Sequence, residues 1–135
     1  VKTLLPDTRV IGLTMARGAA MVESLKAGRP VAVEEFPSLA DSLGGGIGLE
    51  NRYTFQLARD LIDQTLLLSE AQIANAMRHL YFQENLVAEG GGAVGIAPLL
   101  EDLGLDIGRR VAVVVSGRNV DMALFQRVMG GEVPF

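Results

Sequence analysis

One short stretch, Arg110–Asp121 (RVAVVVSGRNVD), constrains the fold of this chain more than any other. Its five consecutive apolar residues, Val111–Val115, are mostly β-branched, and such runs are typical of short strands buried on both faces of a parallel sheet. Gly117 then breaks the strand, and a helical pattern begins at Arg118 or Asn119. The stretch therefore predicts a sharp turn from a buried strand into a helix.

Ser116 sits at the carboxyl end of this predicted strand. In open α/β sheets, ligands bind outside the carboxyl ends of the strands. Ser116 is therefore the first candidate for a side chain that faces a ligand. The pattern alone favours equally a serine that caps the following helix.

The rest of the chain alternates strand and helix signals. Buried strands are predicted over Thr8–Thr14 and Thr65–Leu68, with a short edge strand at Val31–Val33. Four helices are predicted from apolar residues at helical spacing: Met21, Val22 and Leu25; Leu57, Ala58, Leu61 and Ile62; Ile73, Met77, Leu80 and Tyr81; and Val94, Ala97, Leu100 and Leu103. Gly28 ends the first helix, Asn51 caps the second, and the capping box Ser69–Gln72 starts the third. In the fourth, Pro98 predicts a kink or a later start. This order predicts an α/β fold, with a parallel sheet and helices on both faces, formed as a single unit over residues 1–135.

Composition excludes several classes of protein. The net charge is −4 and no basic cluster exceeds the pair Arg109–Arg110, so the chain lacks the footprint of a nucleic-acid binder. No apolar run approaches the roughly 20 residues of a membrane-spanning helix. With no cysteine there are neither disulfides nor thiol nucleophiles, which fits a cytoplasmic protein.

Two glycine-rich segments resemble phosphate-binding loops only superficially. Gly90, Gly92 and Gly95 satisfy the spacing G-x-G-x-x-G, but a helix rather than a strand is predicted before them, which argues against dinucleotide binding. The triplet Gly44–Gly46 lacks the Lys-Ser/Thr of a nucleotide loop. The loop from Glu34 to Glu50 either brings backbone amides close to a ligand or is a flexible connection.

Two titratable residues are candidates for chemistry, His79 and Glu89. His79, the only histidine, lies on an amphipathic helix and is expected to be structural; a hydrolase built on Ser116 and His79 would need the two side chains within hydrogen-bond reach. Glu89 precedes a glycine-rich helix start, where a negative charge is favoured by roughly 0.3–1 kcal/mol. Either Glu89 belongs to a binding site or it is a simple helix-terminus charge.

Three blocks at these separations carry a family resemblance: TRVIGLT with AAMVESLKAGRPV and LADSL, then IGLENRYTFQLARDLIDQTLLLSEAQIANAMRHLY, then LVAEGGGAVGIAPLL with GRRVAVVVSGRNVD. Together they resemble the carboxyl-terminal half of the fold type II pyridoxal-phosphate enzymes, the serine/threonine dehydratase and serine racemase family. Within that family, LADSLGGGIGLENR is most similar to the hydroxyectoine-utilisation dehydratases.

The resemblance implies pyridoxal phosphate as cofactor and places this chain in the large domain of such an enzyme. It implies that Ser116, followed by Gly117, hydrogen-bonds the pyridine nitrogen of the cofactor. A neutral hydroxyl there would leave the nitrogen largely unprotonated, which suits elimination of a β-hydroxyl. The family acid near the ring matches Glu89, and the loop past the cofactor's edge matches Ser42, Leu43 and Gly44.

Two departures from the family pattern matter. Family members that bind a divalent cation have carboxylates where this chain has Thr14 and Ala20, so the metal site is expected to be absent. Where the family usually has a second glycine after its serine, this chain has Arg118. The hypothesis is that Arg118 helps to select an anionic or unusual substrate.

The family's Schiff-base lysine, its Ser-Gly-Asn loop for the substrate carboxylate and its phosphate-binding loop all lie in the preceding half. Neither Lys2 nor Lys26 sits in such a motif, so no catalytic residue is expected in this chain. The chain is interpreted as an inactive fragment of an ammonia-lyase that acts on a β-hydroxy amino acid. Its expected partners are the missing amino-terminal half, the amino-acid substrate and further copies in a homo-oligomer. The competing interpretation is a non-catalytic α/β module that binds a small ligand or regulates.

Overall fold

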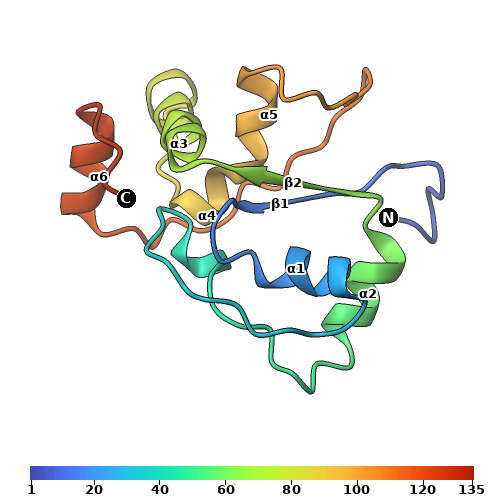
Figure 1. Ribbon diagram of the computed structural model, residues 1–135. Helices are drawn as coiled ribbons and strands as arrows, with labels where there is room; N and C mark the ends of the chain where they lie inside the picture. The colour runs from blue at the N-terminus through green and yellow to red at the C-terminus, as the bar shows by residue number, and fades with distance from the viewer.

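A computed structural model describes residues 1–135 and contains two parallel strands with helices on either side (Figure 1). Strand β1 (Ile11–Met15) pairs with β2 (Gln64–Leu68), in a register that places Met15 beside Leu68. Because the strands are parallel, the residues that follow Met15 and Leu68 lie at the same carboxyl edge. The predicted α/β fold with a parallel sheet is confirmed.

The helices form two groups around the sheet (Figure 1). On one side α1 (Ala20–Ala27) packs against α2 (Thr54–Leu61). On the other side the long helix α3 (Glu70–Glu84) contacts α4 (Gly90–Ala93), α5 (Ala97–Leu100) and α6 (Met122–Met129). Two 3₁₀ turns, η1 (Asp41–Leu43) and η2 (Val94–Ile96), complete the elements. None of the helices has the combination of length and apolarity that a bilayer crossing requires.

Helix α3 begins where the sequence predicts it. The Ser69 hydroxyl accepts a hydrogen bond from the backbone N–H of Gln72, and the Gln72 side chain accepts one from the Ser69 N–H at 2.9 Å, which is a capping box. Ile73, Met77 and Leu80 of this helix are fully buried, as their spacing predicts. Tyr81 instead lies at the edge of the core with 40% of its surface exposed.

The core lies between α3, the strands and α6. Met15 and Leu68 contribute from the strands, and Phe125 and Val128 from α6. The Arg78 guanidinium of α3 donates to the carbonyl oxygen of Val128 at 3.1 Å, which satisfies an acceptor in the last turn of α6.

The predicted strand Val111–Val115 is wrong. The segment is irregular, its backbone groups make no hydrogen bond, and Val114 is 83% exposed. A β-branched apolar run has a preference for extended backbone, but a strand is completed only by a neighbouring strand that takes its N–H and C=O groups. Within this chain β1 and β2 pair only with each other.

Two other predictions differ from the structure. Val31–Val33 is also irregular rather than a strand. The last helix begins at Met122, later than predicted, because the Asp121 carboxylate accepts from the backbone N–H of Leu124 at 2.8 Å and caps it there. Of the two alternatives at Pro98, the later helix start is confirmed, because Pro98 stands in the first turn of α5 and causes no kink.

Candidate functional site at the carboxyl edge

Glu89 joins the start of α4 to the turn that follows Ser116. Its backbone N–H donates to the carbonyl oxygen of Gly117 at 3.2 Å, and its carboxylate accepts from the backbone N–H of Asn119 at 3.1 Å. Gly117 has a left-handed φ of +71°, and a Cβ on it would lie 2.7 Å from Cδ of Glu89. The turn therefore requires glycine both for its backbone and for the approach of this carboxylate.

The glycines of α4 let two other segments approach closely. A Cβ on Gly92 would overlap the carbonyl oxygen of Ser116, and a Cβ on Gly91 would overlap the hydroxyl of Ser42. A Cβ on Gly90 would overlap the carbonyl group of Leu39. Because these glycines have no side chain, the 39–43 loop and the Ser116 turn both pack directly against the backbone of α4.

The same loop reaches the end of β1. A Cβ on Gly44 would lie 3.3 Å from Cε of Met15, the last residue of that strand. The structure thus brings together, around α4 and at the carboxyl edge, all six residues that the sequence suggests for the cofactor: Ser42, Leu43, Gly44, Glu89, Ser116 and Gly117.

The hydroxyl of Ser116 has no hydrogen-bond partner within the chain, and the residue is exposed. The alternative that Ser116 caps the following helix is wrong, because Asp121 takes that role. Arg118, two residues further on, is also exposed and makes no ion pair. Both side chains are free to contact a ligand.

A cavity of about 300 Å³ lies next to Glu89. Its walls come from the loop before η1, from Glu89, and from the segment that leads into α6, with Phe135 at its rim. The lining residues are Pro37, Ser38, Leu39, Asp41, Glu89, Asn119, Val120, Asp121, Leu124 and Phe135. Polar groups from three segments therefore converge here, although Ser116 itself does not line the cavity.

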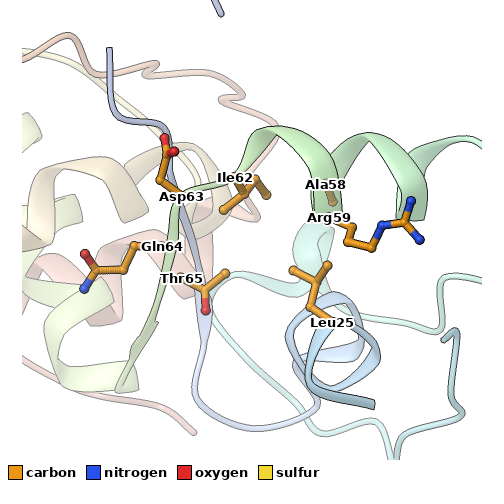
Figure 2. Close-up of a pocket in the computed structure, with 7 residues that line it drawn as sticks. All are labelled: Leu25, Ala58, Arg59, Ile62, Asp63, Gln64 and Thr65. Carbon is orange, nitrogen blue, oxygen red and sulfur yellow. The ribbon is translucent and has the colours of Figure 1, made fainter. Parts of the chain in front are cut away.

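A second cavity, of about 330 Å³, lies at the opposite edge of the sheet (Figure 2). It is bounded by Leu25 of α1, by Ala58, Arg59 and Ile62 at the end of α2, and by Asp63, Gln64 and Thr65 at the start of β2. The Lys2 ammonium, 2.6 Å from the Asp63 carboxylate, and the Val10 N–H that donates to it lower the pKa of Asp63 below 3.8. Both charged side chains of this cavity are already paired, Asp63 with Lys2 and Arg59 with Asp60, so the cavity offers little to a ligand.

Both lysines of the chain form ion pairs away from the candidate site. Lys2 pairs with Asp63 just before β2, and Lys26 pairs with Glu23 at 2.8 Å in the last turn of α1. The amino end of β2 and the carboxyl end of α1 lie on the side opposite α4 (Figure 1). No lysine therefore stands at the carboxyl edge.

Other candidate motifs find no support in the geometry. His79 lies 3.8 Å from Glu84 on its own helix and forms no hydrogen bond with Ser116, so the hydrolase arrangement is absent. The glycines from Gly90 follow α3 and an irregular linker, not a strand, as the argument against dinucleotide binding requires.

Sequence reasoning missed Glu70, Ser38 and Asn119. Ser38 and Leu39 donate to the Glu70 carboxylate, and Asn119 donates to Glu89. Glu70 had a usable signal, because it follows β2 directly and parallel strands end at one edge. Nothing in the sequence marks Ser38 or Asn119, since each is fixed by a contact with a distant segment.

Helices beside a parallel sheet define an α/β protein, and the polar groups gathered at the carboxyl edge stand where proteins of this class bind their ligands. Residues 1–117 match the profile of the family described as “Pyridoxal-phosphate dependent enzyme”. The chain belongs to this family of enzymes, whose cofactor is pyridoxal phosphate.

Curated relatives agree. The chain is 53% identical over 133 residues to the “Putative threonine dehydratase” of Sinorhizobium fredii, covering 98% of this chain and 40% of that protein. It is 36% identical over 129 residues to the L-threonine ammonia-lyase of Thermotoga maritima, covering 96% and 31%. The chain thus spans less than half the length of these relatives.

Solved structures share the fold. The processed form of threonine deaminase isoform 2 from Solanum lycopersicum superposes with a TM-score of 0.82 at 27% identity, over 96% of this chain and 38% of that one. Maize serine racemase gives a TM-score of 0.80 at 25% identity, over 96% and 40%. The predicted fold type II class is confirmed.

The residues at the carboxyl edge fit one wall of a pyridoxal-phosphate site. Ser116 has an unpaired neutral hydroxyl, of the kind that can hydrogen-bond a pyridine nitrogen, on a turn fixed by Glu89. Ser42 and Gly44 are exposed at the same edge. These residues include no amine.

Proposed function

We propose that the protein is a pyridoxal-phosphate-dependent ammonia-lyase of the threonine dehydratase type, which eliminates the β-hydroxyl of an amino acid. The unpaired hydroxyl of Ser116, on a turn that Glu89 holds at the carboxyl edge, is the observation that carries this proposal. The relatives named as threonine dehydratase and L-threonine ammonia-lyase support the reaction type.

Pyridoxal phosphate, when bound, supplies an electron-withdrawing ring that acidifies the α-proton of an attached amino acid. The Ser116 hydroxyl would hold the cofactor through its pyridine nitrogen, and a neutral donor there would suit elimination of a β-hydroxyl. Glu89 fixes the Ser116 turn, with Gly117 directly against its carboxylate. Ser42, Leu43 and Gly44 would lie beside the cofactor at the same edge.

The lysine that anchors the cofactor and moves the α-proton comes from residues outside these 135. The two lysines present are paired at the opposite edge, which supports this assignment. The exposed apolar segment Val111–Val115 would be covered by the amino-terminal half of the same enzyme. The 135 residues alone are therefore inactive.

The test is product formation by the full-length protein with pyridoxal phosphate. L-threonine and L-serine should each give one keto acid and one ammonia per amino acid consumed, because the enamine left after loss of water is hydrolysed. The 135-residue chain should release neither product. Full-length protein that binds the cofactor but releases no keto acid from any β-hydroxy amino acid would contradict the proposal.

Arg118 is proposed to contribute to substrate choice. Its guanidinium is exposed and unpaired next to the turn that carries Ser116, so it is available to an anionic group on the substrate. Arg118→Gly should lower kcat/KM for β-hydroxy amino acids with an additional carboxylate more than for threonine. Equal effects on both substrates would contradict this role.

A role in hydroxyectoine utilisation is proposed from the segment LADSLGGGIGLENR, which includes η1. We propose a cytoplasmic homo-oligomer in that catabolic route. Deletion of the gene should stop growth on hydroxyectoine as nitrogen source while growth on ammonia continues. Unchanged growth on hydroxyectoine would remove this assignment and leave the reaction type standing.

The cavity next to Glu89 favours one other function, a non-catalytic module that binds a small ligand. Such a module would retain cofactor-independent binding and would need no lysine. An upstream in-frame segment of the gene that encodes a lysine motif would favour the ammonia-lyase over the binding module.

A further inference from the structure

We propose that Glu70 is a positioning residue for the candidate site, an inference that rests on the proposed role of Ser42–Gly44 beside the cofactor. Glu70 is the first residue of α3 and lies two residues after Leu68, the last residue of β2. The Ser38 hydroxyl donates to its Oε1 at 2.7 Å, and the Leu39 backbone N–H donates to its Oε2 at 2.8 Å. Both carboxylate oxygens are thus engaged by the loop that leads into η1.

These contacts are in a buried part of the molecule. Ser38 is 6% exposed, Leu39 4% and Ala40 0%. The Ser38 hydroxyl also accepts from the Ala40 N–H at 3.0 Å, which continues the network along the loop. Because a buried N–H without an acceptor is strongly disfavoured, loss of the Glu70 carboxylate forces Leu39 to move or to remain unsatisfied.

The loop that Glu70 holds in turn packs against α4. The Leu39 carbonyl lies against Gly90, and the Ser42 hydroxyl lies against Gly91. Helix α4 begins just after Glu89, whose carboxylate holds the Ser116 turn. Glu70 therefore fixes, from the end of β2, the loop on one side of the site, while Glu89 fixes the turn on the other.

Hydrogen exchange in the cofactor-free full-length protein tests this role without any use of activity. Glu70→Ala should speed exchange of the amides over residues 39–44 about tenfold, the effect of losing one hydrogen bond to a charged acceptor. Glu70→Asp keeps the charge at the start of α3 but withdraws the carboxylate by one methylene, so it should speed exchange similarly. Glu84→Gln, an exposed carboxylate at the other end of α3, is the matched control and should change nothing there.

A second readout ties the loop to the cofactor. Glu70→Ala and Glu70→Asp should raise the Kd of pyridoxal phosphate several-fold, and Glu70→Gln, which keeps the shape and one acceptor oxygen, should recover part of the affinity. If the Ala variant fails to fold, Ser38→Ala serves instead, because it removes one donor and leaves Glu70 in place.

Unchanged exchange over residues 39–44 in the Ala and Asp variants would overturn the proposal. Faster exchange with unchanged cofactor affinity would overturn the link to the site. If Glu70 variants loosen the loop but Ser116→Ala leaves cofactor binding intact, the proposed function fails and not the role of Glu70 in holding the loop.

Discussion

The Glu89 carboxylate occupies the space that a side chain on Gly117 would need. Its Cδ would lie 2.7 Å from a Cβ there, and the same carboxylate accepts from the N–H of Asn119. Helix α4 and the Ser116 turn are thus joined by a contact that only glycine permits, and the position of the Ser116 hydroxyl depends on it.

Gly117→Ala should destabilise the protein by about 2–4 kcal/mol, the sum of a left-handed backbone penalty and an overlap with Glu89. Gly28→Ala is the matched control, because Gly28 has nearly the same φ, +69° against +71°, but open space around it. It should cost only about 1–2 kcal/mol in urea unfolding. Equal losses of unfolding free energy for the two variants would show that the Glu89 carboxylate does not exclude a side chain at position 117.

The contact of Gly92 with the Ser116 carbonyl gives a second prediction. Gly92→Ala should displace the Ser116 turn and lower both stability and cofactor affinity, because backbone atoms there cannot yield as a flexible side chain does. Gly46→Ala has no atom near its new methyl group and should leave both unchanged. Cofactor titration and thermal unfolding of the two variants decide, and a wild-type affinity for Gly92→Ala would argue against this packing.

Ser69→Ala should cost about 1 kcal/mol in unfolding free energy, since it removes the hydroxyl that caps α3. Ser69 stands at the carboxyl end of β2, as a ligand-binding serine would, but its hydroxyl is already engaged by Gln72. Cofactor affinity should therefore stay the same. A large loss of affinity would mean that Ser69 also contacts the cofactor.

Asp63 gives a pH dependence with a defined sign. Lys2 and the Val10 N–H lower its pKa in the folded state, so its contribution to stability is present above its ordinary value of 3.8 and is lost as the pH falls below it. The difference in Tm between wild type and Asp63→Asn should shrink as the pH is lowered from about 5 to 3. A difference that is constant over this range would contradict the ion pair.

Local signals predicted much of the fold. The capping box at Ser69 and the left-handed glycine at Gly28 mark helix ends through contacts between near neighbours, and both are confirmed. On α2, however, Phe55 is the buried residue, whereas Leu57 is 57% exposed, because which face is buried depends on α1 and not on the α2 sequence.

Contacts between segments that are distant in sequence could not be predicted. Val111–Val115 has the composition of a buried strand but no partner within these residues, so composition alone gave the wrong element. The site residues were suggested by family resemblance, and the contacts of α4 bring them together. The place of Glu70 just after β2 was a usable signal, but its contacts with Ser38 and Leu39 could not be predicted, because these residues lie more than 30 positions away in sequence.

The most direct test of the central claim, that the Ser116 hydroxyl holds the cofactor ring, is a titration of full-length protein with pyridoxal phosphate. Ser116→Ala should raise the Kd about tenfold, the effect of losing one hydrogen bond, and should shift the visible absorption of the bound cofactor, whereas Ser69→Ala should do neither. Identical affinity and spectrum for Ser116→Ala and wild type would contradict the account.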